Sequence, residues 1–190
     1  MTTKTTTNSW NLDTVHSGIN FSVRHMVVSK VRGRFSKFTG NIALDESDPA
    51  RSVVEATIDA SSIDTGTAQR DDHLRSADFF DVERFPQIRF RSTGIERLGA
   101  EPGNERYRLT GQLTIRDVGR EIALDVEYGG RGKDPWGNER VGFTAKGAFD
   151  RKDFGLKWNQ ALETGGVLVS DRVEIELEVQ AVRAAAAAAA

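Results

Sequence analysis

The chain has 190 residues, and its 26 lysine and arginine residues nearly balance its 28 aspartates and glutamates. That length suits one domain of ordinary size, and the even charge argues against nucleic acid as the main partner, because phosphate binding needs a basic surplus on one face. The absence of cysteine excludes disulfides and thiol chemistry.

The two ends of the chain differ from its middle. The start, MTTKTTTNSW, is rich in threonine, and we expect residues 1–9 to be disordered or loosely attached. It has no apolar core of the kind that a secretion signal needs. No run approaches the roughly 20 apolar residues that span a bilayer, so we expect a cytoplasmic protein without a transmembrane segment. Residues 184–190 are all alanine and are left out of the predicted domain, which covers residues 10–183.

Alternation of apolar and polar residues predicts eight strands in this domain. A short edge piece at residues 10–13 comes before them. The last strand has the clearest pattern, with apolar residues on one face and three glutamates on the other. The eight segments are 19–25, 31–44, 54–59, 88–91, 107–115, 122–128, 141–149 and 173–181.

The alternation is interrupted once, before Pro86. Leu74, Ala77 and Phe80 fall at helical spacing there, which predicts a short amphipathic helix over residues 71–81. A single helix with one apolar side, set among strands, most simply covers one end of a sheet structure.

Eight half-apolar strands with mostly short connections favour an all-β fold, an antiparallel meander closed into a barrel. A sandwich of two sheets is the alternative. A barrel of this size is either filled by its own side chains or holds one small ligand. Small residues on the expected inner face, such as Gly111 and Ala145, favour a hollow interior, although glycines can also mark the bends that closure needs.

The length of the last strand indicates the class of ligand. Residues 172–182 extend roughly 37 Å at about 3.4 Å per residue, and a tilt of about 40° then gives a barrel about 28 Å tall. An apolar tube of that height suits a long-chain lipid better than a compact metabolite.

Much of the chain resembles the YceI-like family of polyisoprenoid-binding proteins. The resemblance covers about residues 10–183, and its most specific parts are the helix-containing stretch and the FDRKDFG motif. The stretches that carry it are HSGINFSVRHM (16–26), VRGRFSKFTG (31–40), SSIDTGTAQRDDHLRSADFFDVERFPQIRFRST (61–93), LTGQLTIRDVGREIALDVEY (109–128), DPWGNERVGFTAKGAFDRKDFGLKWN (134–159) and the last strand.

The resemblance implies an extended, lipocalin-like barrel of eight antiparallel strands. It also implies a long apolar lumen that holds an isoprenoid or similar amphiphilic lipid, for transport or storage, commonly in a homodimer. Many relatives are exported, and this chain departs from them in lacking a signal. We expect no cofactor apart from the bound lipid.

Arg70, Asp71 and His73 are the polar candidates for the site, because they lie beside the predicted helix, where a lipid head group could meet the lumen. Arg70 and His73 would hydrogen-bond the head group, and Asp71 would orient one of them. Equally, the three could form an ion-pair cluster that pins the helix. His25 shares a strand face with apolar residues and is expected to point inward.

The apolar candidates either line the lumen or pack in the core. Trp158 is expected to cover the mouth, and the FDRKDFG turn is expected to shape the strand ends first and to contact ligand second. The full set of predicted ligand-contacting residues is Phe21, Val23, His25, Phe38, Ile42, Arg70, Asp71, His73, Leu74, Phe79, Phe80, Phe90, Leu113, Phe143, Phe149, Phe154 and Trp158.

A non-enzymatic lipid carrier is the preferred hypothesis, and two others stay open. An enzyme acting on such a lipid would use Asp71 and His73 as an acid–base pair, although the sequence has no GxSxG turn and no phosphate-binding loop. A filled barrel would be an interaction module. Metal binding is disfavoured because His16, His25 and His73 lack the paired spacing of zinc ligands.

Overall fold

The computed structural model describes residues 7–26, 28–45, 47–99, 105–163 and 166–185. These residues form one antiparallel sheet of eleven strands, one α-helix and three short 3-10 helices. None of the helices in the described ranges is long and apolar enough to cross a membrane. Residues 1–6 and most of the alanine tail, 186–190, lie outside the described residues.

The strands follow one another along the chain, with four short helices between some of them. The helices are η1 Pro49–Arg51, η2 Ala60–Ser62, α1 Ala68–Arg75 and η3 Arg151–Phe154. The strands are β1 Thr7–Leu12, β2 Gly18–His25, β3 Ser29–Phe35, β4 Phe38–Asp45, β5 Val53–Asp59, β6 Ile63–Asp64, β7 Gln87–Gly99, β8 Arg106–Ile115, β9 Val118–Lys133, β10 Glu139–Asp150 and β11 Val169–Arg183.

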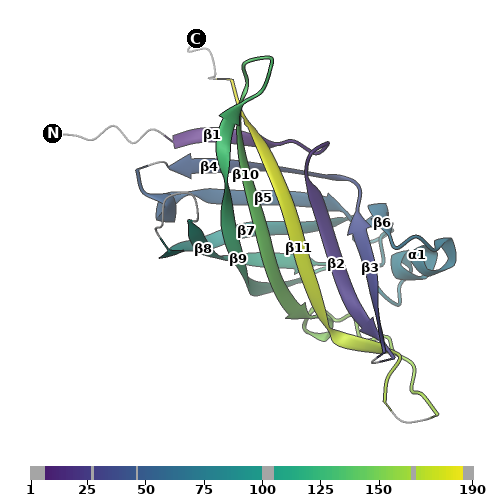
Figure 1. Cartoon of the computed structure of the whole chain (residues 1–190). Coiled ribbons are helices and arrows are strands. Elements are labelled where there is room, and N and C mark those ends of the chain that lie inside the picture. Colours follow the sequence, from purple (N-terminus) through teal and green to yellow (C-terminus); the bar gives the residue numbers. More distant parts are fainter. Residues whose placement is uncertain (1–6, 27, 46, 100–104, 164–165, 186–190) are drawn as a thin grey trace.

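The sheet closes into a barrel because β1 with β2, and β3 with β4, each act as one bent strand. β1 continues into β2 through a corner at residues 13–17, and β3 continues into β4 through residues 36–37. Strand β11 pairs with β2 along most of its length and with β1 at its end, while β4 pairs with β1. Counted as β1–β2, β3–β4, β5, β7, β8, β9, β10 and β11, eight strands form the closed antiparallel barrel that the sequence predicts (Figure 1). The two-sheet alternative is wrong.

Strand β1 corrects two expectations for the N-terminal segment. Residues 7–9, expected to be loosely attached, pair with β4. Residues 10–12 are not an edge piece, because β1 lies between β4 and β11, and Trp10 is completely buried. Threonine is itself a good strand former, so a threonine-rich start is compatible with either outcome.

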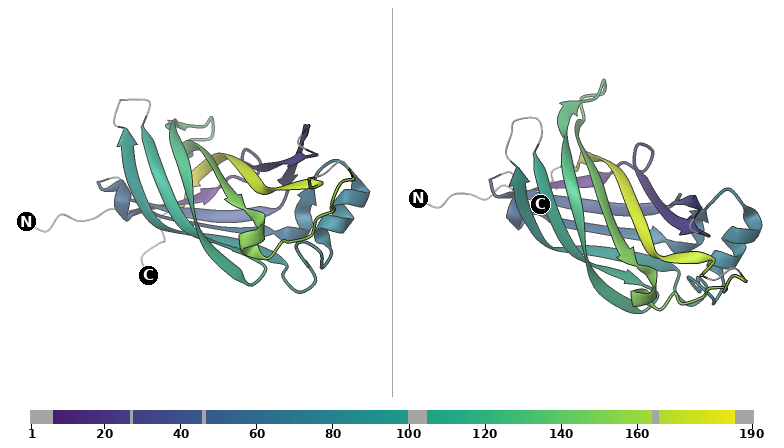
Figure 2. Two further views of the ribbon diagram at one scale, coloured as in Figure 1. Left: turned by 90° about the horizontal axis from the view of Figure 1, so that it is seen from below. Right: turned by 60° about the horizontal axis from the view of Figure 1, so that its bottom comes forward.

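The up-and-down strand order places the connections at alternate ends of the barrel. We call one end the helix end: it carries the β2–β3 turn, α1, the β8–β9 turn and residues 150–169. We call the other the far end: it carries the start of β1, η1, the adjoining ends of β7 and β8, the β9–β10 hairpin and the end of β11. Figures 1 and 2 show α1 beside one end of the barrel and the start of β1 at the other.

The helix predicted over residues 71–81 is confirmed only in its first half. α1 begins at Ala68 and ends at Arg75. The backbone N–H and the hydroxyl of Ser76 both donate to the carbonyl of His73, at 3.1 and 2.7 Å, which caps the helix. Serine often competes with the helical backbone in this way. Phe79 and Phe80 therefore lie in the turns that follow α1.

Candidate functional site

A cavity of about 910 Å³ occupies the inside of the barrel. Every strand of the sheet contributes to its lining, and the lining side chains are mostly apolar. The cavity extends from the helix end, where His73 and Trp158 line it, to the far end, where Trp10 and Glu105 line it. The barrel is therefore hollow, as the sequence favoured, and the alternative of a filled barrel is wrong.

Most of the residues predicted to contact a ligand lie on the cavity wall. Two do not: Asp71 is buried within α1, and Phe154 is completely buried against Phe149, with ring centroids 5.1 Å apart. The predicted residues that line the cavity are Phe21, Val23, His25, Phe38, Ile42, Arg70, His73, Leu74, Phe79, Phe80, Phe90, Leu113, Phe143, Phe149 and Trp158.

The glycines of the sheet do not create the hollow, contrary to the reasoning from the sequence. A β-carbon on Gly111 would lie 2.4 Å from the ring of Phe90, and one on Gly147 would lie 2.6 Å from Leu124. Larger side chains on neighbouring strands already cover these positions. The glycines let those side chains lie flat against the sheet, which thins the wall.

Three aromatic rings close part of the helix end. The ring of His73 meets the rings of Phe79 and Trp158 edge-on, with centroids 5.1 and 4.7 Å apart, and Phe79 and Trp158 are 5.3 Å apart. His73 Nε2 lies 2.9 Å from a carboxylate oxygen of Asp78, which holds the imidazole in this cluster. We call these rings the aromatic lid.

Arg70 and Asp71 hold the loop before α1 in place. Asp71 Oδ1 accepts hydrogen bonds from the backbone N–H and the hydroxyl of Thr65, at 2.9 and 2.5 Å. Arg70 donates to the hydroxyl and the carbonyl of Thr65, at 2.7 and 2.8 Å. These contacts favour the pinning role over the head-group role, with Thr65 at the centre in place of an ion pair. Asp71 and His73 have different partners, so the acid–base pair of the alternative enzyme hypothesis is not assembled.

The FDRKDFG motif shapes the strand ends, as its sequence indicates. Asp150 caps η3 by accepting from the N–H of Lys152 at 2.8 Å, and Gly155 ends η3 with a φ of 77°. Arg151 is almost fully buried and donates to the carbonyls of Leu156 and Trp158, at 2.6 and 2.8 Å. Burial lowers the pKa of Arg151. Its bonds fix the segment that carries Trp158 into the aromatic lid.

The far end contains polar groups that the sequence reasoning missed. Trp10, Glu105, Tyr107, Tyr128 and Arg131 line the cavity there. The guanidinium carbon of Arg131 lies 5.2 Å from the centre of the Trp10 ring, and Arg131 also pairs with Glu139 at 3.0 Å. Both tyrosines share a strand face with apolar residues, which is the one sequence signal that could have placed them inward.

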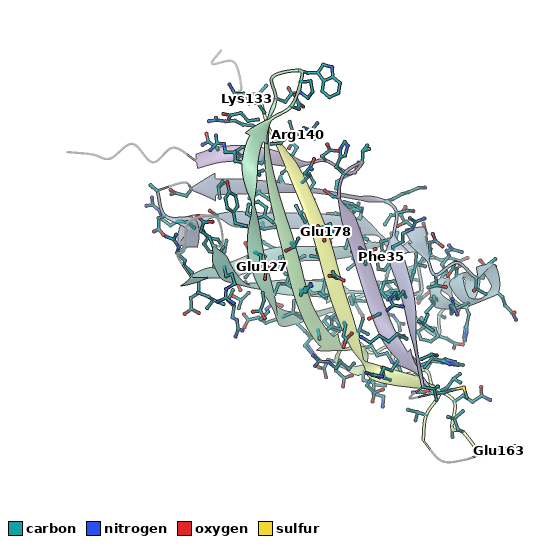
Figure 3. The ribbon with its side chains drawn as sticks, viewed as in Figure 1. Phe35, Glu127, Lys133, Arg140, Glu163 and Glu178 are labelled. Atoms are coloured by element: carbon teal, nitrogen blue, oxygen red, sulfur yellow. The ribbon has the colours of Figure 1, made fainter. Side chains whose placement is uncertain are left out.

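An ionic network joins the corner between β1 and β2 to the β9–β10 hairpin. Arg140, labelled in Figure 3, donates to Asp13 and, at 2.9 Å, to Asp134. The hydrogen bond from Arg140 lowers the pKa of Asp13 far below its usual range. Bonds from the side chain and backbone of Asn138, followed by the bond from Arg140, lower the pKa of Asp134 to about 2.

Two of the three histidines have a carboxylate partner nearby. His16 Nδ1 lies 2.8 Å from Asp13, and His73 is held by Asp78. Across the part of the chain that the structure describes, no group of three or more His, Cys, Asp or Glu is placed to hold a metal ion.

Comparisons with known proteins agree with this architecture. A UPF0312 protein of Photorhabdus laumondii is 42% identical over 142 residues, which cover 75% of this chain and 71% of that protein. The crystal structure of BcnA from Burkholderia cenocepacia has a TM-score of 0.76 at 24% identity, over 89% of this chain and 98% of BcnA. A polyisoprenoid binding domain from Saccharophagus degradans has a TM-score of 0.68 at 13% identity, over 94% of this chain and 100% of that domain.

Both structures share the barrel fold. The model of the YceI-like domain matches residues 10–181, which is nearly the whole barrel. The chain therefore belongs to the YceI-like family.

Proposed function

We propose that this protein binds a long-chain isoprenoid or a similar amphiphilic lipid in its lumen and carries or stores it. The observation that carries the proposal is the 910 Å³ cavity with its apolar lining. The similarity to a polyisoprenoid binding domain supports the same class of ligand.

The size of the cavity is compatible with such a tail. One water takes up about 30 Å³ of liquid, so the space suits on the order of 30 heavy atoms in a chain. Burying about 20 methylene or methyl groups contributes roughly 16 kcal/mol gross at about 0.8 kcal/mol each. Association itself costs about 4–15 kcal/mol, so the apolar wall alone is enough for useful affinity.

The helix end is the proposed entry. The aromatic lid and α1 cover it: α1 joins the barrel through residues 65–67 and 76–86, and Trp158 lies in the connection between η3 and β11. Opening there would require ring contacts and a few side-chain hydrogen bonds to break, such as those from Arg75 to the carbonyls of Ser61 and Ile63, whereas the barrel wall is held by continuous strand pairing. We propose that motion of α1 and the lid admits and releases the lipid.

Binding without catalysis is part of the proposal. Asp71 accepts from Thr65 and His73 contacts Asp78, so neither is placed as a partner of the other for proton transfer. By the same family resemblance we propose a homodimer, which analytical ultracentrifugation would test.

The direct test is mass spectrometry of lipid extracted from gently purified protein. We expect a lipid of isoprenoid mass in about equimolar amount. The delipidated protein should then take up geranylgeraniol, measured by isothermal titration calorimetry. An empty interior after mild purification, together with no uptake of geranylgeraniol, would count decisively against the proposal.

A further inference from the structure

Two buried polar atoms at the far end of the cavity lack a hydrogen-bond partner. They are the indole nitrogen Nε1 of Trp10 and the carboxylate oxygen Oε2 of Glu105. Among the described residues, these are the two buried side-chain N or O atoms without a hydrogen-bond partner. Both residues line the cavity. Native proteins rarely leave such atoms unpaired, because each one loses its bonds to water on folding. Two in one cavity indicate a polar group supplied from outside the chain.

The strand order brings these two residues to the same end. Trp10 pairs with Arg183 at the end of β11, and Glu105 immediately precedes β8, so both are at the far end. The carbonyl of Glu105 accepts from the N–H of Tyr128 at 2.9 Å, and Tyr128 lies three positions before Arg131 on β9. Arg131 in turn stacks over the Trp10 ring at 5.2 Å. Both residues therefore contact the same short stretch of β9, residues 128–131.

We propose that Trp10 and Glu105 form the subsite for the polar head of the bound lipid, and that this head is a neutral hydroxyl-bearing group, as in a lipid alcohol or phenol. The indole N–H can only donate and an ionised carboxylate can only accept. A hydroxyl does both, so it offers Trp10 an acceptor and Glu105 a donor. This inference rests on the proposed lipid-binding function and places the head opposite the aromatic lid.

Charge at the far end disfavours a phosphorylated head. The carboxylate of Glu105 would repel a phosphate inside an apolar cavity, where charges are poorly screened. The cation nearby, Arg131, is paired with Glu139 at 3.0 Å. Asp45, which also lines the cavity, adds a further carboxylate and is paired with Arg51 at 2.7 Å.

The helix end is less suited to binding a head group, because its polar side chains Arg70 and His73 already have partners. Arg70 already donates to Thr65 and Thr67, and His73 Nε2 is already held by Asp78. A head group bound by Arg70 or by His73 Nε2 would have to displace these bonds. At the far end it would satisfy two atoms that have no partner.

Three probes with the same 20-carbon tail test the assignment on the delipidated full chain: geranylgeraniol, its methyl ether and its monophosphate. The ether can accept from Trp10 but cannot donate to Glu105. We expect the alcohol to bind about tenfold more tightly than the ether, the factor that one hydrogen bond to a charged group supplies. The monophosphate should bind more weakly than the alcohol. Isothermal titration calorimetry measures all three.

Variants then locate the effect. Glu105→Leu should remove the preference for the alcohol over the ether, and Trp10→Phe, which keeps a ring, should weaken both about fivefold or more. Glu105→Gln should keep part of the preference, because its amide oxygen still accepts. Glu127→Leu, on the outer face of β9 (Figure 3), is the matched control and should bind like the parent protein. Thermal melts confirm that each variant is folded.

The outcomes separate the two proposals. Equal affinity of the parent protein for all three probes, or a preference that survives in Glu105→Leu, overturns the subsite while lipid binding stands. Loss of the preference in Arg70→Met, with Glu105→Leu unaffected, places the head at the helix end instead. Failure of every probe to bind overturns lipid binding itself and the subsite with it.

Discussion

The ring of Phe90 lies across the backbone of Gly111 on the neighbouring strand, where a β-carbon would be only 2.4 Å from it. The same β-carbon would be 2.7 Å from the carbonyl oxygen of Arg91. Phe90 also lines the cavity. The absence of a side chain at Gly111 therefore sets how far the ring of Phe90 projects into the lumen.

Gly111→Ala should destabilise the barrel by about 1–3 kcal/mol, the usual cost of forcing an extra carbon into a packed position. Gly132→Ala is the matched control: it has no heavy atom within 4 Å of its β-carbon position and should change stability little. Urea unfolding of both variants measures the difference. Equal stability of Gly111→Ala and the parent protein would show that Phe90 can move at no cost.

Ala145→Leu distinguishes a hollow barrel from a filled one. Ala145 lines the cavity, so three added carbons have space there, and we expect stability to change by less than about 1 kcal/mol. The same carbons occupy room that a lipid tail would use, so affinity for geranylgeraniol should fall. Lys146→Leu adds apolar bulk to the exposed outer face of the same strand and should leave affinity unchanged. Severe destabilisation by Ala145→Leu would mean that the interior has no usable space.

Trp158→Ala should open the aromatic lid. The change removes the ring contacts of Trp158 with His73 and Phe79, and such contacts contribute about 0.5–1.5 kcal/mol each. If lipid leaves through the helix end, its dissociation rate should rise about tenfold, the factor that corresponds to about 1.4 kcal/mol. Transfer of a fluorescent lipid to acceptor vesicles measures this rate.

Trp136→Ala is the matched control for the lid, since Trp136 is 82% exposed in the β9–β10 hairpin at the far end. It should leave the dissociation rate unchanged. A faster rate in Trp136→Ala, with Trp158→Ala unchanged, would place the exit at the far end.

Asp71→Ala should cost about 2–4 kcal/mol of stability, because it leaves the N–H and hydroxyl of Thr65 without the charged acceptor that they now share. Asp72→Ala, at a neighbouring carboxylate that is 77% exposed, should cost much less. The affinity of folded Asp71→Ala for geranylgeraniol should match that of the parent protein. A loss of affinity without a loss of stability would restore Asp71 as a ligand-contacting residue.

The period-two pattern predicted the barrel well because one face of each strand points to an apolar interior. The alternation changes phase between Phe35 and Phe38, and the prediction of one unbroken segment 31–44 overlooked that sign of the bend at residues 36–37. It also placed the end of α1 too late. Leu74, Ala77 and Phe80 have helical spacing, but the hydroxyl of Ser76 takes the carbonyl of His73 and ends the helix.

The apolar wall was predictable for the same reason, whereas the polar end of the lumen was not. Glu105 lies just before a strand in a charged stretch, and Arg131 lies in a glycine-rich one, so neither shows the alternation that marks an inward position. Their inward placement depends on which strand ends meet at the far end. That is decided by the closure of the barrel, which no local pattern encodes.

Asp134→Asn should make the stability of the far end less dependent on pH. The pKa of Asp134 is lowered from 3.8 to about 2 by bonds from Asn138 and Arg140, so the ionised form favours the folded state. A lowered pKa contributes stability that is fully present above the unfolded value and is lost as pH falls through the folded value. The melting temperature of Asp134→Asn should thus lie a few degrees below that of the parent protein at pH 7. The two should converge between about pH 4 and pH 2. Asp117→Asn, in the exposed β8–β9 turn, serves as the control. A difference that stays constant down to pH 2 would show that Asn138 and Arg140 do not hold the carboxylate in solution.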